Sequence, residues 1–273
     1  MLVDYSKYRV PPNSSFSLST IDPGAKNVNL DRGAAETQFR ENRNLITKLQ
    51  ERLYAEGKRA LLVVLQAMDT GGKDSTIRAV TKGVNPQGFR IYGFKAPSRH
   101  ELGRDFLWRV HHQVPPKGKI GIFNRSHYED VLIVRVHGWA TPELTEKRYQ
   151  HINDFERLVS DHGTRIVKIM LHISKDYQKE RLVRRLGRPD KLWKFNPDDL
   201  RERARWTDYM NAFEIALQKC STSYAPWFVV PSEKRWYRNL LVSQIIVDAL
   251  NDMNPQFPEA DFKVEDYPPE SII

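Results

Sequence analysis

The residues best suited to chemistry lie in a short loop that follows an apolar run at residues 61–65. That loop carries acids, hydroxyls, glycines and a lysine: Asp69, Thr70, Gly71, Gly72, Lys73, Asp74 and Ser75. Glycines let backbone N–H groups turn inward around an anion, and the N-terminus of a following helix adds positive potential. Lys73 can then reach terminal phosphates as a point charge. The order of strand, glycine loop, lysine and helix predicts a phosphate-binding loop.

The loop departs from the usual pattern G-x-x-x-x-G-K-[ST] at two positions. Ala67 stands in place of the first glycine, and Asp74 in place of the hydroxyl. A further carboxylate, Asp69, lies inside a site built for anions, which is costly unless a cation neutralises it. Mg²⁺ is the expected cation, with Mn²⁺ as an alternative, because Mg²⁺ binds one or two carboxylates together with substrate phosphates. The competing interpretation is a solvent-facing turn between a strand and a helix.

A second polar segment, residues 124–130, follows a strand expected at 119–123 and reads Asn-Arg-Ser-His-Tyr-Glu-Asp. Ligands of doubly wound sheets bind at the carboxyl ends of strands, so we expect this segment beside the loop. Arg125 can contact a phosphate through two nitrogens. Asn124 stands where an acidic metal ligand is common and offers only a neutral carbonyl. In the alternative interpretation, Asn124 caps a turn and Arg125 pairs with Glu129.

A third segment, residues 181–198, is strongly basic and is called the lid here. It carries six cations: Arg181, Arg184, Arg185, Arg188, Lys191 and Lys194. A basic helix, a Gly-Arg-Pro break and a further helix are typical of a lid that closes over phosphates, and its arginines would stabilise charge during phosphoryl transfer. A solvated basic face, or a nucleic-acid patch in which Trp193 stacks on a base, are the alternatives. Lys95, at the end of a strand expected at 88–95, and the cations that follow it would extend this basic surface away from the loop.

The elements that must position these segments alternate between strands and helices. Strands are expected at 61–65, 88–95, 119–123, 165–173 and 227–230, and helices at 34–56, 72–82, 101–112, 145–162, 175–186, 198–220 and 236–253. Such alternation indicates βαβ units and a parallel sheet. The predicted fold is α/β, a P-loop kinase-like three-layer α/β/α sandwich with a five-stranded parallel sheet and a helical lid.

Composition limits the class of protein and its partners. The chain has 273 residues, of which 40% are hydrophobic, and a formal net charge of +9, which favours polyanionic partners. We expect an extended arm at 1–33, one domain at 34–253 and an irregular tail at 254–273. The single cysteine, Cys220, fits a reducing compartment. No apolar run approaches the ~18 residues of a membrane span, and the N-terminus does not read as a secretory signal, so a cytoplasmic location is expected.

Together the three polar segments resemble the polyphosphate kinase 2 family. Residues 67–76 resemble its variant Walker A loop, residues 123–130 its Walker B region and residues 181–198 its lid, in the same order along the chain. The resemblance implies reversible transfer of a terminal phosphoryl group between inorganic polyphosphate and a nucleotide, with Mg²⁺. It also implies a homo-oligomer, a dimer or a tetramer. Neither a nucleic acid nor a membrane is then expected as a partner.

Carried over by position, the resemblance assigns roles to individual residues. Asp69 would hold Mg²⁺ and orient the acceptor phosphate, and Lys73 would contact the phosphates. The arginines that would clamp them are Arg125, Arg184 and Arg185. The remaining phosphate- or nucleotide-binding residues would be Thr70, Gly71, Gly72, Asp74, Ser75, Lys95, Asn124 and Arg188.

Position 124 is also where the chain departs from the family. Many members carry Asp where this chain has Asn124, so whether Asn124 or Asp130 contacts the metal stays open. The Asn-Arg-Ser-His-Tyr-Glu-Asp form resembles the subgroup that accepts AMP as well as ADP. Adenine and guanine nucleotides are therefore the expected substrates beside polyphosphate. The alternatives are an ATP-dependent nucleotide kinase on the same fold and a nucleic-acid-binding P-loop protein.

Overall fold

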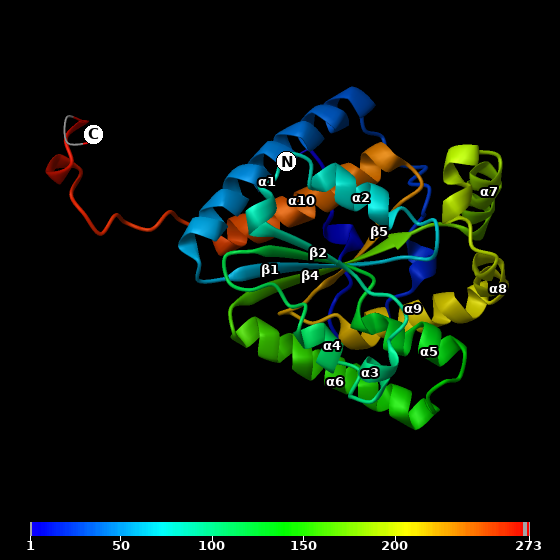
Figure 1. Cartoon of the computed structure of the whole chain (residues 1–273). Coiled ribbons are helices and arrows are strands. Elements are labelled where there is room, and N and C mark those ends of the chain that lie inside the picture. The colour runs from blue at the N-terminus through cyan, green and yellow to red at the C-terminus, as the bar shows by residue number, and fades with distance from the viewer. Residues whose placement is uncertain (1, 270–271, 273) are drawn as a thin grey trace.

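The computed structural model describes residues 2–269 and 272 and is built around a five-stranded parallel sheet (Figure 1). The strand order is β2-β3-β1-β4-β5. The strands are β1 (Ala60–Gln66), β2 (Phe89–Gly93), β3 (Ile120–Asn124), β4 (Thr164–His172) and β5 (Trp227–Pro231). The α/β fold with five parallel strands predicted from the sequence is confirmed.

Strand β1 lies at the centre of the sheet and is buried at every position. It pairs with β3 on one side and β4 on the other, with Leu65 opposite Asn124 and Gln66 opposite Met170. The chain leaves β1 toward one edge of the sheet and returns later on the other side. A crevice therefore forms beyond the carboxyl end of β1, which is where ligands bind in open α/β sheets.

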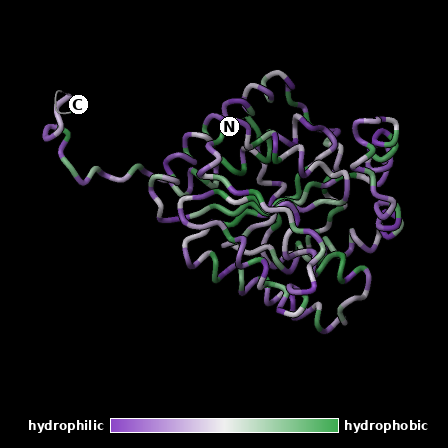
Figure 2. Tube along the Cα trace, viewed as in Figure 1, coloured by the Kyte–Doolittle hydropathy of each residue, from purple (hydrophilic) through white to green (hydrophobic). Residues whose placement is uncertain are grey.

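Helices cover both faces of the sheet (Figure 1). One face carries α1, α2 and α10, the other carries α6 and α9 with several short helices, and α7 and α8 lie at the carboxyl edge. The helices are α1 (Arg32–Glu56), α2 (Lys73–Val80), α3 (Arg99–Leu102), α4 (Trp108–His111), α5 (Ile133–Val136), α6 (Pro142–Asp161), α7 (Lys175–Leu186), α8 (Asp198–Ala204), α9 (Trp206–Cys220) and α10 (Arg235–Met253). Figure 2 shows hydrophobic residues along the strands and mostly polar ones at the lid.

Two predicted helices are wrong in extent. The predicted helix at 101–112 consists of the short helices α3 and α4, because the Asp105 side chain accepts a hydrogen bond from the Leu107 N–H (3.0 Å) and forms a turn between them. The predicted helix at 198–220 is interrupted at Arg205, whose backbone has φ −90° and ψ 23°. There the Arg205 side chain donates to the Val136 carbonyl (3.0 Å), which ties the break to α5.

The segments before α1 and after α10 differ in their contacts. Near the N-terminus, Arg9 forms an antiparallel bridge with Phe228 of β5, and Tyr8 and Tyr237 share a hydrogen bond of 2.9 Å between hydroxyls. This segment covers the open edge of the sheet. The tail after Met253 runs away from the body and is exposed throughout residues 256–269 (Figure 1). Across the described residues, every helix is too short or too polar to cross a bilayer.

Candidate active site

The loop between β1 and α2 adopts backbone conformations that explain its composition. Thr70 has φ 65° and Gly72 has φ 100°, in the left-handed region that favours glycine. A Cβ on Gly71 would lie 2.6 Å from the Ala67 Cβ. Ala67, one of the two departures from the usual motif, therefore fills space that only a small residue and a glycine can share. The Gly71 carbonyl accepts a hydrogen bond from Ser232 (2.7 Å) after β5.

Lys73 lies folded back under this loop. Its Nζ donates to the Ala67 carbonyl at 2.8 Å and to the Met68 carbonyl at 3.4 Å. Burial lowers the pKa of Lys73 to about 8, and the nearby Arg125 acts in the same direction. The lysine is therefore a cation with little solvent around it and is expected to interact strongly with an anion that enters the loop.

Asp69 and Arg125 face each other across the carboxyl ends of β1 and β3. An Arg125 Nη lies 2.5 Å from an Asp69 carboxylate oxygen, whereas Glu129 is 3.7 Å from the same guanidinium. The predicted alternative pair with Glu129 is thus present but is the longer of the two. Arg125 has φ 63°, and its N–H donates to the Leu65 carbonyl at 3.0 Å. The turn is therefore fixed where the strand ends.

A buried network anchors the residues that follow Arg125. The Tyr128 hydroxyl donates to a Glu156 carboxylate oxygen at 3.0 Å, and Lys168 forms an ion pair with the same carboxylate. His127 also contacts Glu156, at 3.1 Å, and burial lowers the pKa of His127. These charges have partners, as buried charges require, and they tie the segment after β3 to α6 and β4.

Asn124 does not cap the turn after β3, so that alternative interpretation is wrong. The cap is the Ser126 hydroxyl, which accepts from the Tyr128 N–H at 3.2 Å. Asn124 instead donates to an Asp74 carboxylate oxygen at 2.9 Å, and Lys194 of the lid lies 3.5 Å from the other. Burial alone would raise the pKa of Asp74, but these two contacts outweigh it and hold the pKa below its usual range.

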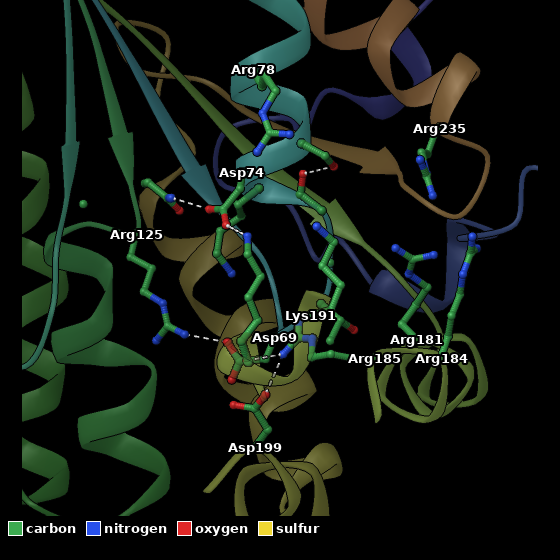
Figure 3. Close-up of a pocket in the computed structure, with 18 of the residues that line it drawn as sticks. Asp69, Asp74, Arg78, Arg125, Arg181, Arg184, Arg185, Lys191, Asp199 and Arg235 are labelled. Carbon is green, nitrogen blue, oxygen red and sulfur yellow. Dashed lines mark hydrogen bonds and ion pairs between the residues drawn. The ribbon is translucent and has the colours of Figure 1, made fainter. Parts of the chain in front are cut away.

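The lid consists of the end of α7, a 3₁₀ helix (Pro189–Lys194) and the turn into α8. Arg185 donates to the Lys194 carbonyl at 2.8 Å and lies 3.2 Å from an Asp199 carboxylate oxygen, which joins its two halves. Arg181 and Arg184 lie across the pocket from Arg125 (Figure 3). Trp193 is 77% exposed and takes no part in lining the cavity described next.

The loop at 69–75, the turn at Asn124 and Arg125, and the lid surround one open cavity of about 530 Å³. Thirteen of the residues predicted from the sequence to act in the site line it: Asp69, Thr70, Gly71, Gly72, Lys73, Asp74, Ser75, Lys95, Asn124, Arg125, Arg184, Arg185 and Arg188. Eleven of its lining residues are lysine or arginine and only three are acidic. This excess of positive charge in a concave site favours a strongly anionic ligand.

Some lining residues were missed by the sequence reasoning, and one candidate lies outside. Asp199 and Arg235 line the cavity. In the sequence, both lie in the first turn of a helix, where a charged side chain is usually at the surface. Burial raises the pKa of Asp199, and the neighbouring charge of Asp69 adds to the effect. Asp130 does not line the cavity and pairs with Arg148 at 3.3 Å. Burial raises the pKa of Asp130 to about 6.

The carboxylates at the cavity suit a divalent cation. Asp69 and Asp199 come close enough for one to raise the pKa of the other, and Figure 3 shows both at the same end of the pocket. Within residues 2–269 and 272, no cluster of three or more His, Cys, Asp or Glu side chains is arranged to hold a metal ion. Mg²⁺ commonly takes one or two carboxylates and completes its shell with water and substrate phosphates, so the side chains present fit that ion.

These features define an α/β protein with a strongly basic cavity at the carboxyl end of its central strand. Residues 29–258 match the family model described as polyphosphate kinase 2. The chain belongs to the polyphosphate kinase 2 family.

Relatives support this assignment over most of the chain. It is 52% identical over 255 residues to an AMP/ADP-polyphosphate phosphotransferase of Meiothermus ruber, covering 93% of this chain and 95% of that protein. It is 44% identical to an ADP-polyphosphate phosphotransferase of Rhodopseudomonas palustris, over 78% of each chain. The crystal structure of polyphosphate kinase 2 from Arthrobacter aurescens superimposes with a TM-score of 0.92 at 45% identity, covering 96% of this chain and 93% of that one.

Proposed function

We propose that this protein transfers the terminal phosphoryl group of inorganic polyphosphate to a nucleotide, reversibly. The observation that carries the proposal is the cavity at the carboxyl end of β1, where eleven cationic and three acidic side chains surround a phosphate-binding loop. A single nucleotide needs fewer cations than this, whereas two polyanions that meet end to end need many. Family membership supports the same reaction.

AMP and ADP are the acceptors we propose, with guanine nucleotides as further candidates. The support is the Asn-Arg-Ser-His-Tyr-Glu-Asp segment at residues 124–130 and the relative from Meiothermus ruber, whose name specifies both AMP and ADP. A relative in Corynebacterium glutamicum carries the name of a putative GDP-polyphosphate phosphotransferase.

In the proposed mechanism, an oxygen of the nucleotide's terminal phosphate attacks the end phosphate of polyphosphate in line, and the bond from that phosphate to the rest of the chain breaks, so that polyphosphate leaves one unit shorter. Such transfer depends mainly on positioning and charge stabilisation. Asp69 would hold Mg²⁺, with Asp199 as a second carboxylate, and the ion would reduce the repulsion between the two phosphate chains. No general base is required, because a nucleotide phosphate is already mostly ionised near neutral pH.

The chain's own cations have distinct tasks in this proposal. Lys73 contacts the phosphate in the loop from below, and Arg125 from the side of β3. Arg184, Arg185 and Arg188 approach from the lid and exclude water when they close on the substrate. Because Arg125 also pairs with Asp69, it holds that carboxylate in place before substrate binds.

The proposed function is tested with an acceptor panel of AMP, ADP and GDP, each supplied with polyphosphate and Mg²⁺ and without ATP. We expect ADP and then ATP from AMP, and ATP from ADP, separated by ion-exchange chromatography. Turnover that appears only when ATP is supplied would contradict the proposal and favour an ATP-dependent kinase on the same fold.

We also propose a cytoplasmic homo-oligomer, a dimer or a tetramer. The support for assembly is the tail, which carries exposed apolar side chains that find no cover in one copy: Phe257, Phe262, Val264 and Tyr267. Light scattering of the whole chain after size exclusion measures its mass. A monomer at micromolar concentration would contradict the proposed assembly.

A further inference from the structure

A buried arginine lies directly behind the phosphate-binding loop. Arg238, on the first turn of α10, is only 2% exposed. Its Nη2 donates to the Ser75 hydroxyl at 3.2 Å and to the Asn239 side-chain oxygen at 3.0 Å. A Cβ added to Gly72 would lie 2.1 Å from its Nη1. The guanidinium therefore fills the space that Gly72 leaves open and supports the turn at the start of α2.

The charge of Arg238 has no acidic partner. None of the ion pairs formed by the described residues includes it, whereas the buried Lys168 pairs with Glu156. Burial lowers the pKa of Arg238 to about 10, and the positive charges of Arg235 and Arg181 act in the same direction. Buried charges are normally paired, because an unpaired one loses its solvation and gains no partner in return.

The position of this charge indicates what compensates it. Arg238 does not line the cavity itself, so it cannot touch a ligand there directly. It lies behind Gly72 and Ser75, which do line the cavity, and behind the first turn of α2, whose N–H groups have no helical acceptor. In a poorly solvated region its field reaches the cavity with little screening. An anion bound in the loop would therefore relieve the unpaired charge.

We propose that Arg238 is a positioning residue for polyphosphate, held behind the Gly72–Ser75 turn and electrostatically unpaired until polyphosphate occupies the loop. This inference rests on the proposed function and adds a residue from outside the cavity to it. In the free protein the unpaired charge of Arg238 is then unfavourable, and the bound polyphosphate removes this electrostatic cost. Loss of the charge should therefore weaken polyphosphate binding without destabilising the free protein.

The test is a thermal melt of the whole chain with and without polyphosphate, in the absence of nucleotide. Arg238→Met and Arg238→Gln both remove the charge, and the glutamine keeps a donor for Ser75. We expect the polyphosphate-induced rise in Tm to fall below half its wild-type value in both, while the ligand-free Tm stays the same or rises. Arg238→Lys should recover most of the polyphosphate-induced rise. The KM for polyphosphate should increase about five- to tenfold in the neutral variants, with kcat changed less than about twofold.

Arg59→Met is the matched control. Arg59 pairs with Glu56 at 2.5 Å and does not line the cavity, so its loss should lower the ligand-free Tm and leave the polyphosphate-induced rise intact. A full polyphosphate-induced rise in both neutral Arg238 variants overturns the inference. Absence of any rise in the wild-type protein overturns the proposed function, and the inference with it.

Discussion

The two walls of the cavity are built differently. The loop that carries Asp69 to Ser75 is held from behind by the buried Lys73, by Ser232 and by Arg238. The lid is joined to that loop by a single ion pair, Lys194 to Asp74 at 3.5 Å, and its apolar side chains are open to solvent, with Leu192 48% exposed and Trp193 77% exposed.

This difference indicates that the loop and the lid have different functions. A buried, hydrogen-bonded loop keeps its geometry whether or not substrate is present, as preorganised catalytic groups must. A segment with few buried contacts opens at a small cost in free energy, as a lid must. We infer that changes in the loop's own residues, Asp69 to Ser75, act mainly on turnover, and that changes in the lid act mainly on substrate capture.

The largest expected effect is at Asp69. Asp69→Asn keeps the size of the side chain but removes the charge that would hold Mg²⁺, so we expect kcat to fall on the order of 10³-fold. The Tm should change little, because Asp69 lies at the edge of the cavity and not in the core. Steady-state turnover with Mg²⁺ present measures this, and near wild-type kcat would contradict the metal assignment.

Gly72→Ala tests whether the loop is rigid. An added Cβ meets the Arg238 guanidinium and sits at φ 100°, so either the buried Arg238 side chain or the loop must shift, and we expect a loss of about 10²-fold in kcat. Gly138→Ala is the control, since Gly138 has φ 65° but nothing lies within 4 Å of the added atom. Equal activity in the two variants would contradict the inference that the loop must keep this shape for turnover.

The pH dependence of polyphosphate use should reflect Lys73. Because burial lowers its pKa to about 8, the side chain is protonated and positively charged below that pH and loses its charge above it. We expect kcat/KM for polyphosphate to fall between about pH 8 and pH 9.5, and Lys73→Arg to abolish that fall. Over the same range, this lysine binds more protons in the unfolded chain than in the folded one. Its contribution to the free energy of unfolding should therefore increase as the pH rises. A kcat/KM profile unchanged by Lys73→Arg would exclude this lysine.

The smallest expected effect is in the lid. Lys194→Met removes the ion pair with Asp74, and we expect the KM for polyphosphate to rise about threefold with kcat and Tm nearly unchanged. Arg201→Met, which removes an exposed pair with Asp198 at 3.1 Å, is the control and should leave the KM unchanged. A change confined to kcat would contradict the division between loop and lid.

Local patterns explain why so much of the site could be predicted from the sequence. The strand ending at Gln66, the glycines of the loop and the basic run from Arg181 to Lys194 are each contiguous in sequence. The rule that parallel strands end at a common edge then places Asn124 and Arg125 beside the loop. All of these residues line one cavity in the structure.

The residues that were missed depend on contacts between distant segments. Asp199 is a ligand candidate only because α8 begins next to Asp69, and nothing in its local pattern marks it. Arg238 lies on a helix of mostly buried residues, and its partner Ser75 is 163 positions away in the sequence. The break at Arg205 likewise follows from a contact with α5, which no helical periodicity records.

The central claim is that polyphosphate, and not ATP, is the phosphoryl donor at this cavity. The most direct measurement supplies polyphosphate and ADP as the only phosphate compounds, with Mg²⁺, and follows ATP with a coupled luminescence assay. We predict ATP formation by the wild-type protein at a rate proportional to its concentration, and a rate lower by on the order of 10³-fold for Asp69→Asn. No ATP from the wild-type protein, or equal rates for the two proteins, would contradict the account.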